Sequence, residues 1–352
     1  GVHLNNPRLL MKSWCSKNTS AETRETPFDI RNFLVIVVVL IFIVPFDGEG
    51  AGLPDSSHAR IVIVDVDDKS IEELGRWPWT RDIHGRLINV LNRYGAKAII
   101  FDIIFSEPDT RYPEKDEFLI DVTKKSGNVY FASVFYPLIE GEPQRIERMH
   151  LLDRFKAPYR KTLSGGIRHV RNALLPIEGL SVNAKGVGFV NVFSGEKPGS
   201  IQGKGMISVP QRGMITQFPL LMVYGEKVYF SLPLLVASDY LSLKGNSIRI
   251  IPGSYLRING LSIPIDSEGD FDLKFSPPYT RFGHYSYIDV LGRKNRDLAS
   301  ILKGALVIVS YNATGLSDYK VTPVSNYFPG SELIATAIDN IVSLAREQAK
   351  EK

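Results

Sequence analysis

The sequence predicts an α/β fold: a mainly parallel buried sheet flanked by helices, an antiparallel β-rich portion, and one N-terminal membrane helix. Short β-branched apolar runs at 61–66 and 98–104, with helical patterns between them, are typical of strands buried on both faces. An apolar run that follows a series of basic residues indicates the membrane helix.

Composition limits the classes of partner and site. Hydrophobic residues make up 44% of the 352 and charged residues 23%, which are ordinary values for a globular protein. A net charge of +4 is too small to indicate nucleic-acid binding. Cys15 is the only cysteine, so an intrachain disulfide and a cysteine-based metal site are both excluded.

Every residue from 33 to 44 is apolar, yet a spanning helix needs about 20 such residues. A buried core segment, a cleaved signal peptide and a signal anchor are therefore all considered. Extension back to Phe28 gives a nearly spanning segment. Basic residues precede the run, and no Lys or Arg occurs from 47 to 59. The positive-inside rule then predicts a cytoplasmic tail (1–30), a transmembrane signal anchor (31–46) and an extracytoplasmic body (47–345) before a C-terminal tail (346–352).

This arrangement predicts a single-pass protein of the inner membrane, with its body on the periplasmic or extracellular side. The membrane is thus an expected partner. A basic stretch from 145 to 171 is either a solvated loop or a contact with anionic headgroups or a protein.

The first βαβ unit organises the chain. A strand at 61–66 ends among acids, and Ser70 with Glu73 forms a capping-box pattern for a short helix that Gly75 ends. An amphipathic helix from about 80 to 94 leads to the strand at 98–104. Because parallel strands end at one edge of a sheet, we expect Asp65 and Asp102 to lie close together on adjacent strands.

Further elements follow in order. We expect a helix near 118–125 and a strand at 129–135. A β-rich portion at about 183–275 follows and includes a strand at 187–193. Within this portion we expect a helix at 231–241 with Ser231 as its N-cap. A buried strand at 305–310 and a polar loop at 311–328 precede a helix that starts at Ser331.

Acids at the predicted ligand edge are the candidate ligand-binding residues. They are Asp65, Asp67, Asp68, Asp102, Glu107 and Asp318. Clustered carboxylates suit Mg²⁺ or Ca²⁺, so such an ion is possible at Asp65 and Asp102, although no cofactor is required. The alternative is that the acids cap helices and pair with nearby arginines. A catalytic role would need an oxyanion hole or a nucleophile–base pair, and neither is recognisable.

An aromatic turn provides candidate interface or lid residues: Arg76, Trp77, Trp79 and Arg81. Aromatic side chains are frequent interface anchors. The alternative is a turn packed on its own domain.

Several of these stretches resemble the type-2 CHASE domain. They are VDVDDKSI (64–71), GRWPW followed by Arg81, Gly95–Ala96 and FDIIFSEPD (101–109), with a weaker match at GVGFVNV (186–192). The resemblance implies an extracellular sensing module, anchored by an N-terminal membrane helix, of the kind associated with cyclases and histidine kinases.

The chain also departs from the family pattern. Arg212, Gly213 and Thr216 replace an Asp-Gly-x-x-Arg element, Ile334–Thr336 replaces His-Ala-Asn, and Val309–Tyr311 replaces Ile-Gly-Ala. The resemblance therefore does not imply ligand contacts at those positions.

The sequence therefore predicts a non-catalytic sensor that binds a small ligand, an ion or a partner, forms a homodimer or binds an envelope protein, and relays the signal across the membrane. A structural or scaffolding protein of the cell envelope is the alternative, followed by a metal-dependent phosphoesterase. No output domain is recognisable in these residues.

Overall fold

The computed structural model describes residues 58–137, 148–159, 163, 166–193, 213–243, 247–276, 281–294, 297–315 and 318–351. The predicted tail and membrane anchor, residues 1–46, lie outside this part of the chain. Among the described helices, none combines the length and the apolar composition that crossing a bilayer requires.

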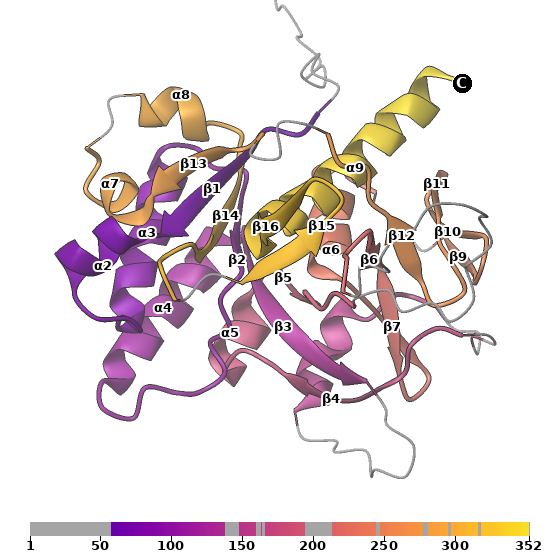
Figure 1. Ribbon diagram of the computed structural model, residues 1–352. Helices are drawn as coiled ribbons and strands as arrows, with labels where there is room; N and C mark the ends of the chain where they lie inside the picture. Colours follow the sequence, from indigo (N-terminus) through magenta and orange to yellow (C-terminus); the bar gives the residue numbers. More distant parts are fainter. Residues whose placement is uncertain are drawn as a thin grey trace, which may run out of the picture. The chain divides into compact units, whose positions relative to one another are not determined.

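A central sheet with the order β13-β1-β14-β2-β3-β4, in which β5 also pairs with β3, forms the middle layer (Figure 1). All pairings are parallel except β3 with β4. The mainly parallel sheet is therefore confirmed. Its strands are β1 (Ile61–Val66), β2 (Ala98–Phe101), β3 (Val129–Pro137), β4 (Val170–Leu174), β5 (Gly186–Phe189), β13 (Gly283–Ser286) and β14 (Leu306–Tyr311).

The predicted adjacency of the first two strands is wrong, because β14 lies between β1 and β2 and pairs with both. A βαβ pattern specifies that its two strands are parallel. It does not specify whether a strand from the far end of the chain will insert between them. The expected strand at 98–104 also ends earlier, at Phe101.

Helices cover both faces of the sheet, because successive residues of a strand point to opposite sides. Val62 and Val64 pack in the cluster that includes residues of α3 and α4, whereas Ile61 and Ile63 pack in the cluster that includes residues of α6 and α9. The described helices are α2 (Asp68–Leu74), α3 (Arg81–Arg93), α4 (Pro113–Ser126), the 3₁₀ helix η1 (Met149–Phe155), α5 (Glu178–Asn183), α6 (Leu232–Tyr240), α7 (Tyr287–Leu291), α8 (Leu298–Leu302) and α9 (Gly330–Lys350).

Several helix ends differ from the predicted ones. The N-cap of α2 is Asp67 rather than Ser70: the Asp67 carboxylate accepts a hydrogen bond from the Ser70 amide at 2.9 Å. Gly75 ends this helix as predicted, with φ of +88°, which favours glycine. Helix α4 starts before the expected position 118. Ser231 is the N-cap residue of α6, but its side chain makes no capping bond.

The β-rich portion is only partly as predicted. It contributes small antiparallel groups, but β5 from the same stretch belongs to the main parallel sheet. Gly188 in β5 allows the start of α6 to pack directly on this strand, because a Cβ there would lie 2.6 Å from the Leu232 amide nitrogen. The antiparallel strands are β6 (Gln217–Pro219) with β12 (Asp270–Asp272), β7 (Leu221–Tyr224) with β8 (Lys227–Phe230), and β9 (Ile248–Ile251) with β10 (Tyr255–Ile258) and β11 (Leu261–Pro264).

The predicted polar loop at 311–328 contains a hairpin, β15 (Tyr319–Thr322) with β16 (Ser325–Pro329). Strand β13 and helices α7 and α8 were also not predicted, since their sequences lack a long apolar run. Helix α9 continues through the residues expected to form a tail.

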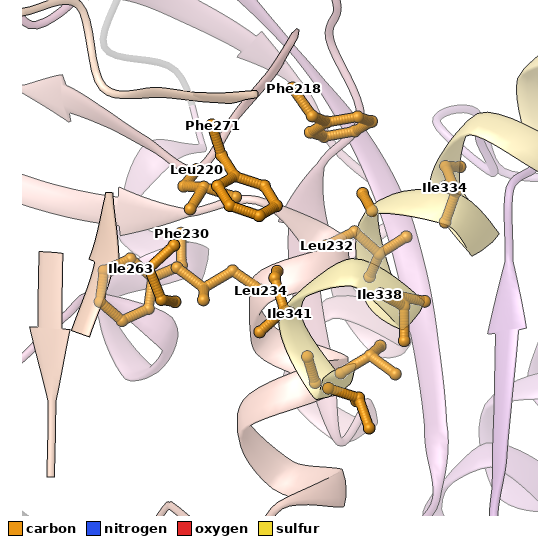
Figure 2. Close-up of a cluster of buried hydrophobic side chains, with 14 of the residues drawn as sticks. Phe218, Leu220, Phe230, Leu232, Leu234, Ile263, Phe271, Ile334, Ile338 and Ile341 are labelled. Atoms are coloured by element: carbon orange, nitrogen blue, oxygen red, sulfur yellow. The ribbon is translucent and has the colours of Figure 1, made fainter. Parts of the chain in front are cut away.

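Helix α9 joins the sheet to the β-rich portion. Its first three turns, from Ser331 to Val342, are entirely buried. Figure 2 shows Ile334, Ile338 and Ile341 of α9 in one apolar cluster with Leu232 and Leu234 of α6. Side chains of β6, β8, β11 and β12 complete the cluster: Phe218, Phe230, Ile263 and Phe271. This cluster packs the buried turns of α9 against α6, the β-rich portion and one face of the sheet.

Candidate functional site

Polar side chains form a row at the carboxyl ends of the central strands. Asp65 of β1 is in register with Ser310 of β14 and with Ser286 of β13. The Ser310 hydroxyl donates a hydrogen bond to Asp102, which follows β2, at 2.9 Å. Strand alternation places Asp65, Ser310 and Asp102 on the face that α9 covers.

His284 of β13 lies between two buried carboxylates. Its Nδ1 is 2.6 Å from Asp65 Oδ2, and its Nε2 is 2.8 Å from Glu332 Oε1. The exposed fractions of Asp65 and Glu332 are 4% and 0%. These three residues, which we call the histidine bridge, connect β1, β13 and the first turn of α9.

The His284 ring in the histidine bridge is positively charged at neutral pH. Burial alone lowers the pKa of His284, but its hydrogen bonds to Asp65 and Glu332 outweigh burial and raise that pKa to about 9. Both ring nitrogens therefore donate at neutral pH. Burial raises the pKa of Glu332, and the bond to His284 opposes this change. The second oxygens, Asp65 Oδ1 and Glu332 Oε2, are buried and accept no hydrogen bond within the described residues.

A cavity of about 240 Å³ lies beside the row, next to Asp102. Asp318 and Lys320 line it from β15 and the residue before it, and Gly330 lines it from the start of α9. The other lining residues are Val134, Val190, Asn191, Val192, Phe218, Leu333 and Ile334. We call this cavity the Asp102 pocket.

Charge in the Asp102 pocket depends on pH in the neutral range. Burial raises the pKa of Asp102 to about 7, and the Asp318 carboxylate adds to this rise. The hydrogen bond from Ser310 and the charge of Lys320 oppose it. Near neutral pH this carboxyl group can therefore either donate or accept a hydrogen bond. Lys320 Nζ lies 2.6 Å from Asp318 Oδ1, so these two charges largely balance.

The predicted acids separate into different environments. Asp102 and Asp318 share the Asp102 pocket, whereas Asp65 belongs to the histidine bridge. Asp68 accepts bonds from the Thr314 amide and hydroxyl at 2.9 and 2.8 Å. The remaining two acids are structural or exposed: Asp67 caps α2, and Glu107 lies in an exposed loop.

The expected pairing of Asp65 with Asp102 is therefore wrong. With β14 between their strands, the two positions are two strand spacings apart, about 10 Å. In the part of the chain that the structure describes, no three acidic, histidine or cysteine side chains are grouped as metal ligands. The Mg²⁺ or Ca²⁺ ion considered for Asp65 and Asp102 assumed adjacent carboxylates, whereas β14 separates their strands.

The aromatic turn packs on its own domain. Trp79 is buried, and its ring centroid lies 5.0 Å from those of Trp77 and Tyr287; the Trp77 ring lies 5.1 Å from Tyr311. The Trp77–Pro78 peptide bond is cis. Arg81 forms an ion pair with Asp116 at 3.4 Å and donates to the Glu107 carbonyl at 3.1 Å. Arg76 is exposed. Packing explains Trp79 and Arg81, whereas Trp77 and Arg76 keep an accessible side.

The sequence gives no indication of His284, Glu332 or Lys320. His284 lies in a short polar stretch without neighbouring metal-ligand spacing. Glu332 is an acid in the first turn of a helix, where it is expected merely to complement the helix dipole. Their significance comes from contacts between residues 219 and 48 positions apart.

We expect His284→Gln to remove pH-dependent stability. A folded-state pKa of about 9, above the ordinary 6.5, gives stability that is complete below pH 6.5 and is lost as the pH rises through 9. The wild type should lose roughly 3 kcal/mol of unfolding free energy across this range. Urea unfolding of the full chain at several pH values measures the effect. His150→Gln is the control, since His150 is exposed. An unchanged pH profile in His284→Gln would contradict the bridge.

Asp102→Asn should make the protein more stable than the wild type at high pH. Because the folded pKa of Asp102 is raised from 3.8 to about 7, its ionisation destabilises the fold as the pH rises through that range. Asp102 is only half-buried, so solvent screening limits this destabilisation. Above the folded-state pKa of about 7, we expect the unfolding free energy of the variant to exceed that of the wild type by about 1–2 kcal/mol. Asp121→Asn, an exposed change on α4, should have no such effect. Equal stability of Asp102→Asn and wild type at all pH values would show that Asp102 ionises normally.

Comparison with known proteins identifies the family. A family model described as the CHASE2 domain matches residues 40–351. No curated protein and no solved structure gives a significant match. The matched region covers most of the chain and includes both the histidine bridge and the Asp102 pocket. The chain therefore belongs to the CHASE2 family, whose members are sensor domains of signalling proteins and are not themselves catalytic.

Proposed function

We propose that this chain is a membrane-anchored extracytoplasmic sensor that binds a small polar ligand in the Asp102 pocket and relays binding through α9. The observation that carries the proposal is the position of α9. Gly330, Leu333 and Ile334 in its first turns line the pocket, and its later turns hold the segment by which the chain enters the domain.

Asp339 connects α9 to the segment by which the chain enters the domain. This carboxylate in the middle of α9 is 1% exposed. It accepts a hydrogen bond from the Ala59 amide at 3.1 Å, lies 3.0 Å from the His58 ring and forms an ion pair with Arg281. Arg346 donates to the His58 carbonyl at 2.9 Å. Entry segment and C-terminal helix are thus held together, which supports a path from the pocket to both ends of the domain.

The pocket favours ligands that carry hydroxyl or ammonium groups. Asp102 can accept from either group, and an ammonium group would favour its ionised form and release its proton. Lys320 can exchange its bond with Asp318 for one to a ligand oxygen. Relay requires that the ligand bind two arrangements of α9 with different affinity.

Ligand binding can be tested by thermal shift of the full chain against amino acids, polyamines and polyols. We expect at least one of these classes to raise the melting temperature, because ligands that bind only the folded state stabilise it. The shift should be lost in Asp102→Asn and retained in Asp121→Asn. Hydrogen exchange with and without the hit should change along α9 and at residues 58–66. Uniformly flat responses, or a shift that Asp102→Asn retains, would contradict the proposal.

A second candidate is a scaffolding role through self-association at the β15–β16 hairpin. Tyr319 and Tyr327 on this hairpin are 47% and 73% exposed, and their ring centroids lie 6.1 Å apart. Exposed tyrosines are frequent interface anchors.

For this role, we expect the double variant Tyr319→Ser/Tyr327→Ser to reduce dimer formation in chemical cross-linking by severalfold. Tyr112→Ser, at an exposed tyrosine before α4, is the control. A chain that is monomeric before substitution, or dimers that persist in the double variant, would exclude the hairpin as the dimer contact.

A further inference from the structure

Basic side chains form a row at the opposite edge of the sheet, where the parallel strands begin. Arg60, Lys97 and Lys185 immediately precede β1, β2 and β5, and Lys303 lies shortly before β14. The strand order places them along one edge, spaced by about 4.8 Å per strand. Four exposed cations therefore lie within about 20 Å. We call this the amino edge.

Within the part of the chain that the structure describes, the side chains of Arg60 and Lys97 contact backbone carbonyls rather than acidic side chains. Arg60 donates to the Ser300 and Lys303 carbonyls at 2.9 and 3.3 Å, and Lys97 to the Tyr240 carbonyl at 3.4 Å. In the described ranges, none of Arg60, Lys97, Lys185 and Lys303 forms an ion pair. Burial and repulsion from Arg346 lower the pKa of Lys97, in keeping with excess positive charge here.

Exposed lysines at the carboxyl edge are different. Lys69 pairs with Asp289 at 2.6 Å, and Lys294 pairs with Glu73 at 2.7 Å. Acidic partners therefore neutralise Lys69 and Lys294, unlike the four cations of the amino edge.

The amino edge continues into a cavity of about 230 Å³. Arg154 and Lys156, from the basic stretch noted in the sequence, line it with Lys185, and Phe155 and Phe230 contribute apolar wall. Asp239, an acid in this lining, already accepts a hydrogen bond from the Tyr130 hydroxyl at 2.5 Å.

We infer that the amino edge is a docking surface for a bilayer that contains anionic lipids. A row of unpaired cations complements a layer of phosphate headgroups, and each such cation contributes about fivefold to membrane binding. The position of the chain supports this partner. His58 and the later turns of α9 lie at this edge, and thirteen residues, 45–57, separate it from the apolar run at 33–44. That tether reaches at most about 45 Å, so the edge stays near any membrane that holds the run.

The inference adds an orientation to the proposed sensor, and it does not depend on a ligand in the Asp102 pocket. Docking would place the Asp102 pocket on the side away from the membrane.

Lysine acetylation by an N-hydroxysuccinimide ester, read by mass spectrometry, tests the docking. The full chain is reconstituted in nanodiscs of phosphatidylcholine alone or with about 30 mol % phosphatidylglycerol. We expect Lys97, Lys185 and Lys303 to react at least threefold more slowly with the anionic lipid, because headgroups screen their amines. Salt at about 0.5 M should restore the reaction rate, since it shortens the screening length. Lys69 and Lys294 serve as internal controls and should not change.

Matched variants make the test specific. Lys185→Gln/Lys303→Gln should abolish the protection of Lys97, whereas Lys69→Gln/Lys294→Gln should leave it intact. Equal acetylation with both lipids would overturn the inference. Protection by free glycerol phosphate in phosphatidylcholine discs would also overturn it, since the edge would then be a site for a soluble anion. Neither result would affect the thermal-shift test of the Asp102 pocket.

Discussion

The protonated imidazole of His284 between two buried carboxylates is the interaction on which the carboxyl edge depends. It connects β1, the edge strand β13 and the start of α9, three segments that are far apart in the sequence. Removal of one partner from a buried ionic group leaves an uncompensated charge, which is strongly destabilising. The charge of one side chain therefore helps to hold the start of α9 against the sheet, and with it the wall of the Asp102 pocket.

Local patterns were sufficient to predict most of the core elements. The apolar runs in β1 and β14 and the stripes of α3 and α9 reflect the period of each element, which neighbouring residues determine. The insertion of β14 between β1 and β2 was not predictable in this way, because it depends on pairing between opposite ends of the chain. Strand β13 and the β15–β16 hairpin were missed because their polar sequences resemble loops.

The candidate site, too, was predictable only where local sequence patterns determine it. Asp102 and Asp318 could be placed at the ligand edge because acids that follow buried strands gather there. His284 and Glu332 could not, since only tertiary contacts make them partners. Asp65 was assigned to the correct edge but to the wrong partner, because the intervening strand was unknown.

Attachments along α9 determine how it can transmit a displacement. Glu332 holds its first turn, Asn340 exchanges hydrogen bonds with the Lys274 backbone at 2.6 and 3.3 Å, and Gln348 does the same with Ser262 at 3.0 and 2.6 Å. A helix attached at its start, middle and end behaves as a stiff rod rather than a flexible connection. Its length is about 31 Å, so a tilt of about 5° at the pocket would move its far end by roughly 3 Å. Geometric leverage of this kind would convert a small adjustment beside Asp102 into a larger displacement at the C-terminal end of α9.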